Sequence, residues 1–215
     1  QEAEVEAALA WSGQRPVQWL YANMPVDARW CLVHATHLDD AELEAIVDSD
    51  AVVGLCPITE ANLGDGLFPL RAFSGRFGVG SDSNVYIDAA EELRLLEYGQ
   101  RLTHQRRNVL VGDARRSTGR HLFEAALQGG AQALGVATGL QVGAPADLVE
   151  LDPSHPALVA RHGDAILDSW LFAARNGAVK SVWRQGRRLV AEGRHVARER
   201  IQARYQQALS ALLRG

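Results

Sequence analysis

The sequence predicts an α/β protein that contains a section of a (β/α) barrel followed by a small β unit. Three observations predict this fold class. Short apolar runs at residues 30–33, 51–56 and 76–79 alternate with stretches of helical periodicity. Polar residues with catalytic potential follow these runs, where a barrel places its active site. Beyond Gly139 the pattern changes to short strands of hairpin type.

Composition limits the partners that we expect. The chain has 215 residues and a formal charge of −4, and its basic residues are dispersed, which argues against nucleic acid as a partner. No apolar stretch approaches the roughly 18 residues of a membrane span, and no basic-then-apolar leader is present. The chain opens without Met and within a helical pattern, so we expect it to be part of a longer polypeptide.

The first third of the chain predicts two helices, a strand, a helix and a second strand. We expect a helix over 2–11 ended by Gly13 and a short helix begun by Pro16. The run at 30–33 predicts a buried strand, and Asp39 or Asp40 should cap the helix that ends near residue 48. The continuous apolar run at 51–56 is typical of a strand covered on both faces. Two cysteines lie in these two strands and should be buried, reduced thiols: Cys31 and Cys56.

The middle of the chain predicts a polar loop, a third strand and two helices. The loop spans 57–66, and the strand at 76–79 ends in a Gly-Ser-Asp corner. An amphipathic helix should run from 88 to about 104, and a polar connector should follow at 106–116. Ser117 or Thr118 should cap the next helix, which we expect to be interrupted or ended at Gly129-Gly130, with another turn at 131–134.

The last third predicts a strand at 148–151, a helix at 164–174 and a hairpin at 179–190 that turns at Gln185-Gly186. A final amphipathic helix covers 199–213 and, with the helix at 88–104, is a candidate subunit contact. We therefore expect residues 1–138 to be barrel, residues 139–195 to be a small β unit with an inserted helix, which the resemblance described below makes part of a β-sandwich, and residues 196–215 to be a C-terminal helix.

His34 and Asp82 are the candidate catalytic residues because each follows the end of a predicted strand. Imidazole and carboxylate together suit a divalent metal such as zinc, or a proton-transfer site. Two groups cannot hold zinc alone, and His37 would point to the opposite face if the segment were extended. The alternative for Asp82 is that it only caps the next helix or tightens a turn.

Glu60 and Asn62, in the predicted loop, could bind a polar substrate, although hydrogen bonds within the loop would explain them equally well. A serine nucleophile at Ser81 or Ser83 is disfavoured because no Gly-x-Ser-x-Gly elbow surrounds it. Gly78-x-Gly80 is a weak dinucleotide signal, because an acid follows the glycines in place of a helix start.

Several segments, in order, resemble the metal-dependent amidohydrolase superfamily: Val-His-Ala-Thr-His at 33–37, Thr-Glu-Ala-Asn-Leu-Gly-Asp-Gly at 59–66, the corner at 78–84, and Pro-Ala-Asp-Leu-Val-Glu-Leu-Asp at 145–152. The resemblance covers nearly the whole chain and implies the C-terminal half of a (β/α)8 barrel. It makes Asp82 a metal ligand, zinc being the expected metal, and the acceptor of the water's proton. It gives His34 a role in holding the attacking water and the intermediate.

The resemblance implies hydrolysis of the formimidoyl C=N bond of a small-molecule substrate, N-formimidoyl-L-glutamate, in histidine degradation, with release of ammonia. The superfamily's His-x-His pair, its further histidine ligand and its general-acid glutamate have no match here, and we expect them upstream, so this chain alone should be inactive. A cytoplasmic homodimer is implied. The alternatives are a related enzyme that deaminates a purine, pyrimidine or guanidine-like group, and a non-catalytic scaffold.

Overall fold

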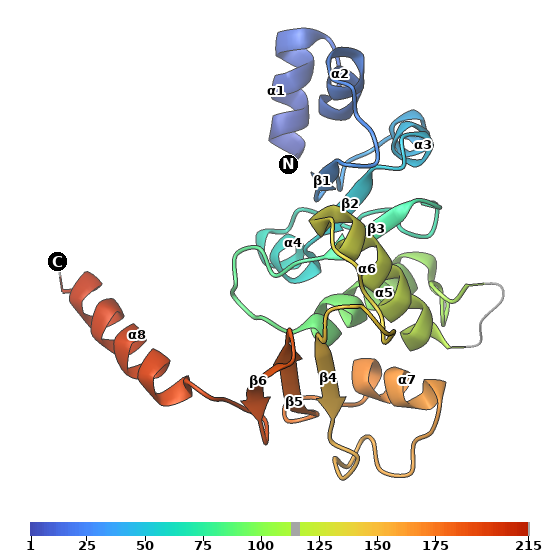
Figure 1. Cartoon of the computed structure of the whole chain (residues 1–215). Coiled ribbons are helices and arrows are strands. Elements are labelled where there is room, and N and C mark those ends of the chain that lie inside the picture. The colour runs from blue at the N-terminus through green and yellow to red at the C-terminus, as the bar shows by residue number, and fades with distance from the viewer. Residues whose placement is uncertain (113–116, 215) are drawn as a thin grey trace. The chain divides into compact units, whose positions relative to one another are not determined.

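The computed structural model describes residues 1–112 and 117–214 of the chain (Figure 1). Residues 113–116, part of the predicted polar connector, lie outside the described residues. Contacts between Cα atoms divide the chain into two units, one of residues 1–138 and 161–173, the other of residues 139–160 and 174–215. The predicted division into three parts stays a prediction, and each unit is described by itself.

The first unit is built on a parallel sheet, which confirms the α/β prediction. The sheet has the order β1-β2-β3, from Cys31–Val33, Val52–Leu55 and Arg76–Val79. Val33 pairs with Gly54 and Leu55 pairs with Val79, so all three strands end at one edge. The helices are α1 (Glu2–Ser12), α2 (Pro16–Asn23), α3 (Asp40–Asp48), α4 (Pro57–Leu63), α5 (Ala89–His104), α6 (Thr118–Leu134) and α7 (Asp164–Phe172).

The core forms around β2, the central strand. Val52, Val53 and Leu55 are fully buried, as expected for a strand covered on both faces. Four helices contribute core side chains: Ile46 of α3, Leu93 of α5, Leu122 of α6 and Leu171 of α7. The sequence prediction of a buried first strand is wrong. Val33 is 56% exposed and Cys31 is exposed, because both side chains point to the face of β1 that the described residues leave uncovered, whereas Leu32 on the other face packs against the core.

The helices begin and end at predicted capping residues, and the structure decides between the two candidates that the sequence offers for α3 and for α6. Gly13 ends α1 in the left-handed conformation, with φ of 72°. Asp39, not Asp40, caps α3: its side chain accepts from the Glu42 backbone N–H at 2.9 Å, and Glu42 accepts in return from the Asp39 N–H. Ser117, not Thr118, caps α6.

The prediction of a polar loop over 57–66 is wrong, because its first part is helix α4. Proline begins this helix at its first position, and Gly64 ends it with φ of 73°. The Glu60 carboxylate accepts from the Cys56 N–H at 2.8 Å, and Glu92 of α5 accepts from the Ile58 N–H at 2.9 Å. These two bonds satisfy backbone donors that a helix start leaves free.

The predicted interruption of α6 at Gly129-Gly130 is also wrong, because the helix continues to Leu134. The glycines serve packing: α6 lies across β2 and β3 (Figure 1). A Cβ at Gly129 would stand 2.0 Å from the Phe77 carbonyl oxygen of β3, whereas a Cβ at Gly130 would meet nothing within 4 Å. Gly129 therefore sets how closely α6 approaches the sheet.

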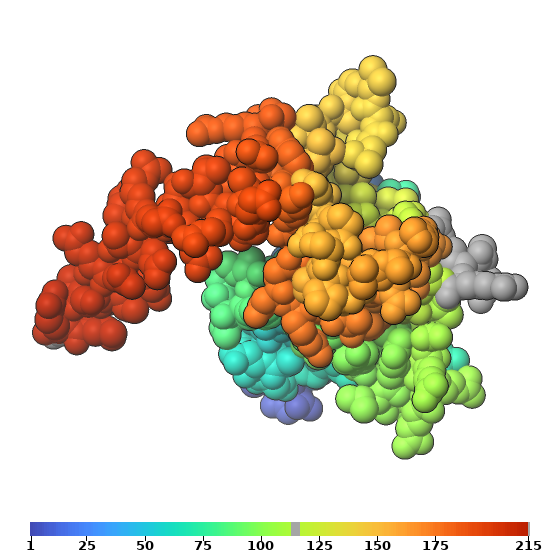
Figure 2. All heavy atoms as spheres, turned by 90° about the horizontal axis from the view of Figure 1, so that it is seen from below, coloured from blue at the N-terminus to red at the C-terminus, as the bar shows by residue number. Residues whose placement is uncertain are grey.

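The second unit holds an antiparallel sheet in the order β4-β5-β6-β7, from Leu148–Leu151, Val179–Arg184, Arg187–Ala191 and Arg194–His195. The predicted hairpin is confirmed, and its turn residues Gln185 and Gly186 both have positive φ, as a tight two-residue turn requires. Helix α8 (Arg198–Leu212) follows and has no buried residue; Figure 2 shows it in red with its side chains in view. No helix within the described ranges has both the length and the apolar character of a membrane span.

Replacing Gly129 by alanine should lower the free energy of unfolding by roughly 1–3 kcal/mol, because backbone atoms must move to admit the methyl group. Gly130→Ala is the matched control. It should be neutral or stabilising by up to about 1 kcal/mol, since alanine is the better helix former. Urea unfolding of the polypeptide that contains this chain measures both. Equal effects of the two substitutions would contradict the packing role of Gly129.

Glu92 should make stability depend on pH. Its carboxyl group is buried, one oxygen has no hydrogen-bond partner among the described residues, and burial raises its pKa from 4.5 to about 7, with Glu60 adding to the rise and the Ile58 hydrogen bond opposing it. Between those two values the unfolded chain has released a proton that the folded chain keeps. Stability should therefore fall by about 3 kcal/mol as the pH rises through this window and level off above it.

The variant Glu92→Gln should lose this dependence and be the more stable protein at pH 8, with little difference from the wild type at pH 4.5. Glu44→Gln, an exposed change on α3, is the control and should follow the wild type at every pH. Urea unfolding at several pH values measures the differences. If the free energies of unfolding of the wild type and of Glu92→Gln changed with pH in parallel, Glu92 would titrate as an ordinary glutamate.

Candidate active site

The parallel sheet brings the two predicted catalytic residues to the same edge. The His34 N–H donates to the Gly54 carbonyl at 2.8 Å, just past the end of β1. The Gly80 N–H donates to the Leu55 carbonyl at 2.9 Å, just past the end of β3. Because neighbouring strands are about 4.8 Å apart, the ends of β1 and β3 lie on the order of 10 Å from each other, with the end of β2 between them.

The chain turns sharply at His34, where φ is 64°, and at Ala35, where φ is 48°. The strand ends at Val33, so the argument from strand alternation, which set His34 and His37 on opposite faces, does not apply. His37 takes another role: its ring nitrogen Nε2 lies 2.8 Å from the Asp65 carbonyl oxygen. That contact ties the loop after α4 to the loop after β1.

The imidazole of His34 contacts a buried acid. Its Nδ1 lies 3.2 Å from Oε1 of Glu60, whose side chain is 4% exposed, while the His34 ring is 27% exposed. The same oxygen accepts from the Cys56 N–H. The sequence indicates both His34 and Glu60 as site residues but not their contact, because it predicts a loop over residues 57–66. Asn62 lies exposed on α4, and substrate binding by Glu60 and Asn62 stays a prediction.

Asp82 presents an exposed carboxylate at the corner after β3. Its φ is 39°, and the Asn84 N–H donates to the Ser81 carbonyl across the turn. Within the described residues, the carboxylate accepts one hydrogen bond, from the Ser83 hydroxyl at 3.3 Å. Asp88, not Asp82, caps α5, which excludes the alternative of a helix cap for Asp82.

Thr59 is a residue that sequence analysis missed. It is 1% exposed, and its hydroxyl contacts the Asp82 corner on both sides: it donates to the Ser81 carbonyl at 3.4 Å and accepts from the Ser83 N–H at 3.3 Å. The sequence signal that could have identified Thr59 is its position next to Glu60 in a segment that follows a strand.

A metal ion could use Asp82 as one ligand, since a free carboxylate supplies the oxygen donor that divalent metals take. Nowhere in residues 1–112 and 117–214 do three or more His, Cys, Asp or Glu side chains gather to hold a metal. The described chain thus fits one part of a metal site and not the whole of it.

Cys56 lies at the end of β2, between the two candidate residues. Burial, together with the nearby carboxylates of Glu60, Asp82 and Glu92, raises the pKa of its thiol to about 11. A thiol with this pKa stays protonated at neutral pH, so Cys56 is not a nucleophile here. The cysteine fills space beneath the site.

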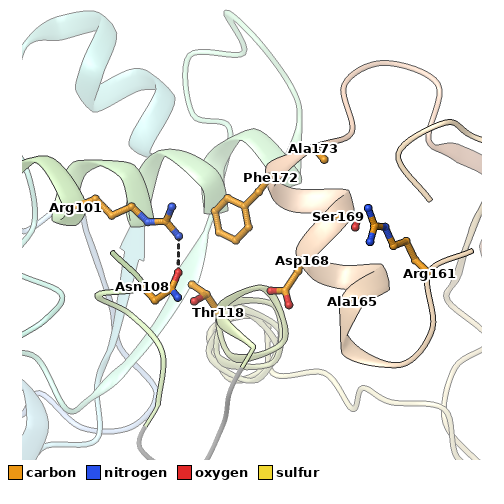
Figure 3. Close-up of a pocket in the computed structure, with 9 residues that line it drawn as sticks. All are labelled: Arg101, Asn108, Thr118, Arg161, Ala165, Asp168, Ser169, Phe172 and Ala173. Atoms are coloured by element: carbon orange, nitrogen blue, oxygen red, sulfur yellow. Dashed lines mark hydrogen bonds between the residues drawn. The ribbon is translucent and has the colours of Figure 1, made fainter. Parts of the chain in front are cut away.

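A pocket of about 390 Å³ opens elsewhere, between α5, α6 and α7 (Figure 3). Its polar groups hold the structure together: Arg101 donates to Asn108 at 3.0 Å, and Asp168 accepts from the Ser117 hydroxyl and the Gly119 N–H. Neither His34 nor Asp82 lines it, so the candidate active site is the sheet edge and not this pocket.

Known proteins with similar sequences and structures support the same fold. No family model matches the chain. Formimidoylglutamate deiminase of Pseudomonas aeruginosa is 53% identical over 99% of this chain, which covers 48% of that protein. The 5-methylthioadenosine/S-adenosylhomocysteine deaminase of Natronomonas pharaonis is 27% identical over 82% of the chain, which covers 41% of that protein.

Two solved structures superpose closely on this chain. An amidohydrolase from Brucella melitensis superposes with a TM-score of 0.92 at 49% identity, over 99% of this chain and 48% of that one. An adenosine deaminase from Xanthomonas campestris with bound zinc superposes with a TM-score of 0.86 at 25% identity, over 99% of this chain and 49% of that one. The chain spans about half the length of the relatives that it matches. Over almost all of its length the chain is similar to about half of a formimidoylglutamate deiminase and to about half of an amidohydrolase of solved structure.

Proposed function

We propose that the polypeptide containing this chain hydrolyses N-formimidoyl-L-glutamate to N-formyl-L-glutamate and ammonia with one divalent metal, zinc. The observation that carries the proposal is the 53% identity to formimidoylglutamate deiminase over 99% of the chain. The placement of His34 and Asp82 at one sheet edge supports it, because hydrolysis of a C=N bond needs both a proton acceptor and a group that stabilises the intermediate.

Each candidate residue has a role in this reaction. A divalent metal, when bound, supplies a water of lowered pKa. Asp82 would be one ligand of that metal, and its carboxylate would take the proton of the attacking water. His34 would orient the water through its ring and stabilise the charge that develops on the heteroatoms of the tetrahedral intermediate. Asn62, exposed on α4, would contact the substrate or line its approach.

The remaining groups would come from the part of the relatives that this chain does not span. That part would supply further metal ligands, the general acid that protonates the leaving ammonia, and cations for the two substrate carboxylates. The proposal also includes a cytoplasmic homodimer in histidine degradation, and a β-sandwich at 139–195 that follows the barrel section.

Ammonia release from N-formimidoyl-L-glutamate by the full-length polypeptide, measured beside its metal content, tests the proposal. We expect release with about one metal ion per subunit. Asp82→Asn should lower kcat at least about 100-fold and weaken metal retention, because the amide is a poor ligand and cannot take the proton. Folding should be unchanged, since the Asp82 carboxylate is exposed.

Asp48→Asn removes an exposed carboxylate at the end of α3 and is the control, with wild-type activity expected. Bound metal without ammonia release from this substrate would favour a purine, pyrimidine or guanidine-like substrate. A folded sample with no bound metal and no ammonia release would rule out the proposed chemistry and favour a scaffold. Full activity of Asp82→Asn would refute the role of Asp82 as metal ligand and proton acceptor.

A further inference from the structure

Two consecutive residues of α4 contact both candidate catalytic segments. Glu60 contacts the imidazole of His34 at 3.2 Å, and Thr59 contacts the backbone on both sides of Asp82. Both residues are buried, with exposed fractions of 3% for the whole of Glu60 and 1% for the whole of Thr59. One turn of helix therefore links the end of β1 to the end of β3 across the end of β2.

This turn of α4 is itself fixed from two sides. Glu60 accepts from the Cys56 N–H at the end of β2, so the helix is tied to the central strand. Glu92 of α5 accepts from the Ile58 N–H, so the helix is tied to its neighbour. Because this turn of α4 is held by both the sheet and a second helix, its side chains can position neighbouring groups while losing little further conformational entropy.

The contact with Glu60 also selects how His34 presents its ring. A carboxylate only accepts hydrogen bonds, so Nδ1 of His34 must carry the proton and donate it. The ring nitrogen Nε2 is then the atom left for chemistry. Carboxylates that contact the far nitrogen of a functional histidine commonly fix its tautomer and ring orientation in this way.

We propose that Thr59 and Glu60 are positioning residues, Glu60 for the tautomer and orientation of His34, and Thr59 for the Asp82 corner. The proposal rests on the proposed function for its kinetic consequences, and on the geometry alone for the state of the His34 ring. It differs from direct substrate binding by Glu60, which would affect substrate affinity and not the ring of His34.

The kinetic test uses the full-length polypeptide and separates kcat from KM. Glu60→Ala should lower kcat roughly 10–100-fold with KM changed less than about threefold, and Glu60→Gln, which keeps an acceptor oxygen, should recover part of the loss. Thr59→Val removes the hydroxyl at constant size and should lower kcat about tenfold, and Thr59→Ser should restore it. Glu42→Gln, a change at another buried helix glutamate, affects a side chain that bonds to Arg15 and Asp39 and to neither His34 nor Asp82, and it should keep wild-type kinetics.

A second readout does not depend on turnover. Nitrogen-15 chemical shifts of the His34 ring, in histidine-labelled protein, report which nitrogen carries the proton. We expect protonated Nδ1 in the wild type and in Glu42→Gln, and a shift toward protonated Nε2 in Glu60→Ala. Circular dichroism should show that each variant remains folded.

The outcomes separate the two proposals. A wild type that releases no ammonia but shows the Glu60-dependent change at His34 would refute the proposed substrate and keep the positioning role. Ammonia release with a His34 ring that is indifferent to Glu60, or with a loss confined to KM, would refute the positioning role of Glu60. Thr59→Val with wild-type kcat would refute the role of Thr59.

Discussion

The pairing of β2 with a parallel strand on each side is the constraint on which the rest of the first unit depends. In this pairing the backbone groups of β2 form hydrogen bonds on both edges of the strand. The side chains of β2 are fully buried, so other elements must cover both of its faces. Helices therefore have to lie on the sheet, and α6 does so at a distance that only glycine at position 129 allows. The same pairing aligns the three strand ends, so whatever follows β1 and β3 arrives at one edge.

Two buried acids, Glu60 and Glu92, lie near these strand ends, and the free-energy cost of burying a carboxylate explains their hydrogen bonds. Burying a carboxylate is unfavourable unless hydrogen bonds replace the lost water. Glu60 accepts from two donors, the Cys56 N–H and the His34 ring. Glu92 has a single backbone donor at Ile58 and a second oxygen without a partner in the described part of the chain, and burial raises its pKa to about 7. The two acids thus fix α4 with different numbers of hydrogen bonds.

The sequence carried enough information for β2, for most helix ends and for the position of the site. An apolar run without alternation identifies a strand covered on both faces, and Gly13 and Asp39 carry their own local signals. Two features depended on tertiary contacts that no local pattern contains. Gly129 looked like a helix breaker because its neighbour across the packing interface, Phe77, is 52 positions away in the chain. Helix α4 looked like a loop because its buried face is polar.

That polar face also explains how strained backbone persists at the strand ends. His34, Ala35, Asp82 and Asn84 all have positive φ, which costs such residues on the order of 1 kcal/mol each and needs surrounding contacts to maintain. A loop of polar residues with free backbone donors could not supply fixed contacts to two separate turns. A helix can, because Thr59 and Glu60 leave it at a fixed angle to each other and reach the two turns from one rigid base. The buried side of α4 is polar because its partners are the turns that present His34 and Asp82, and apolar residues there would leave both turns unsupported.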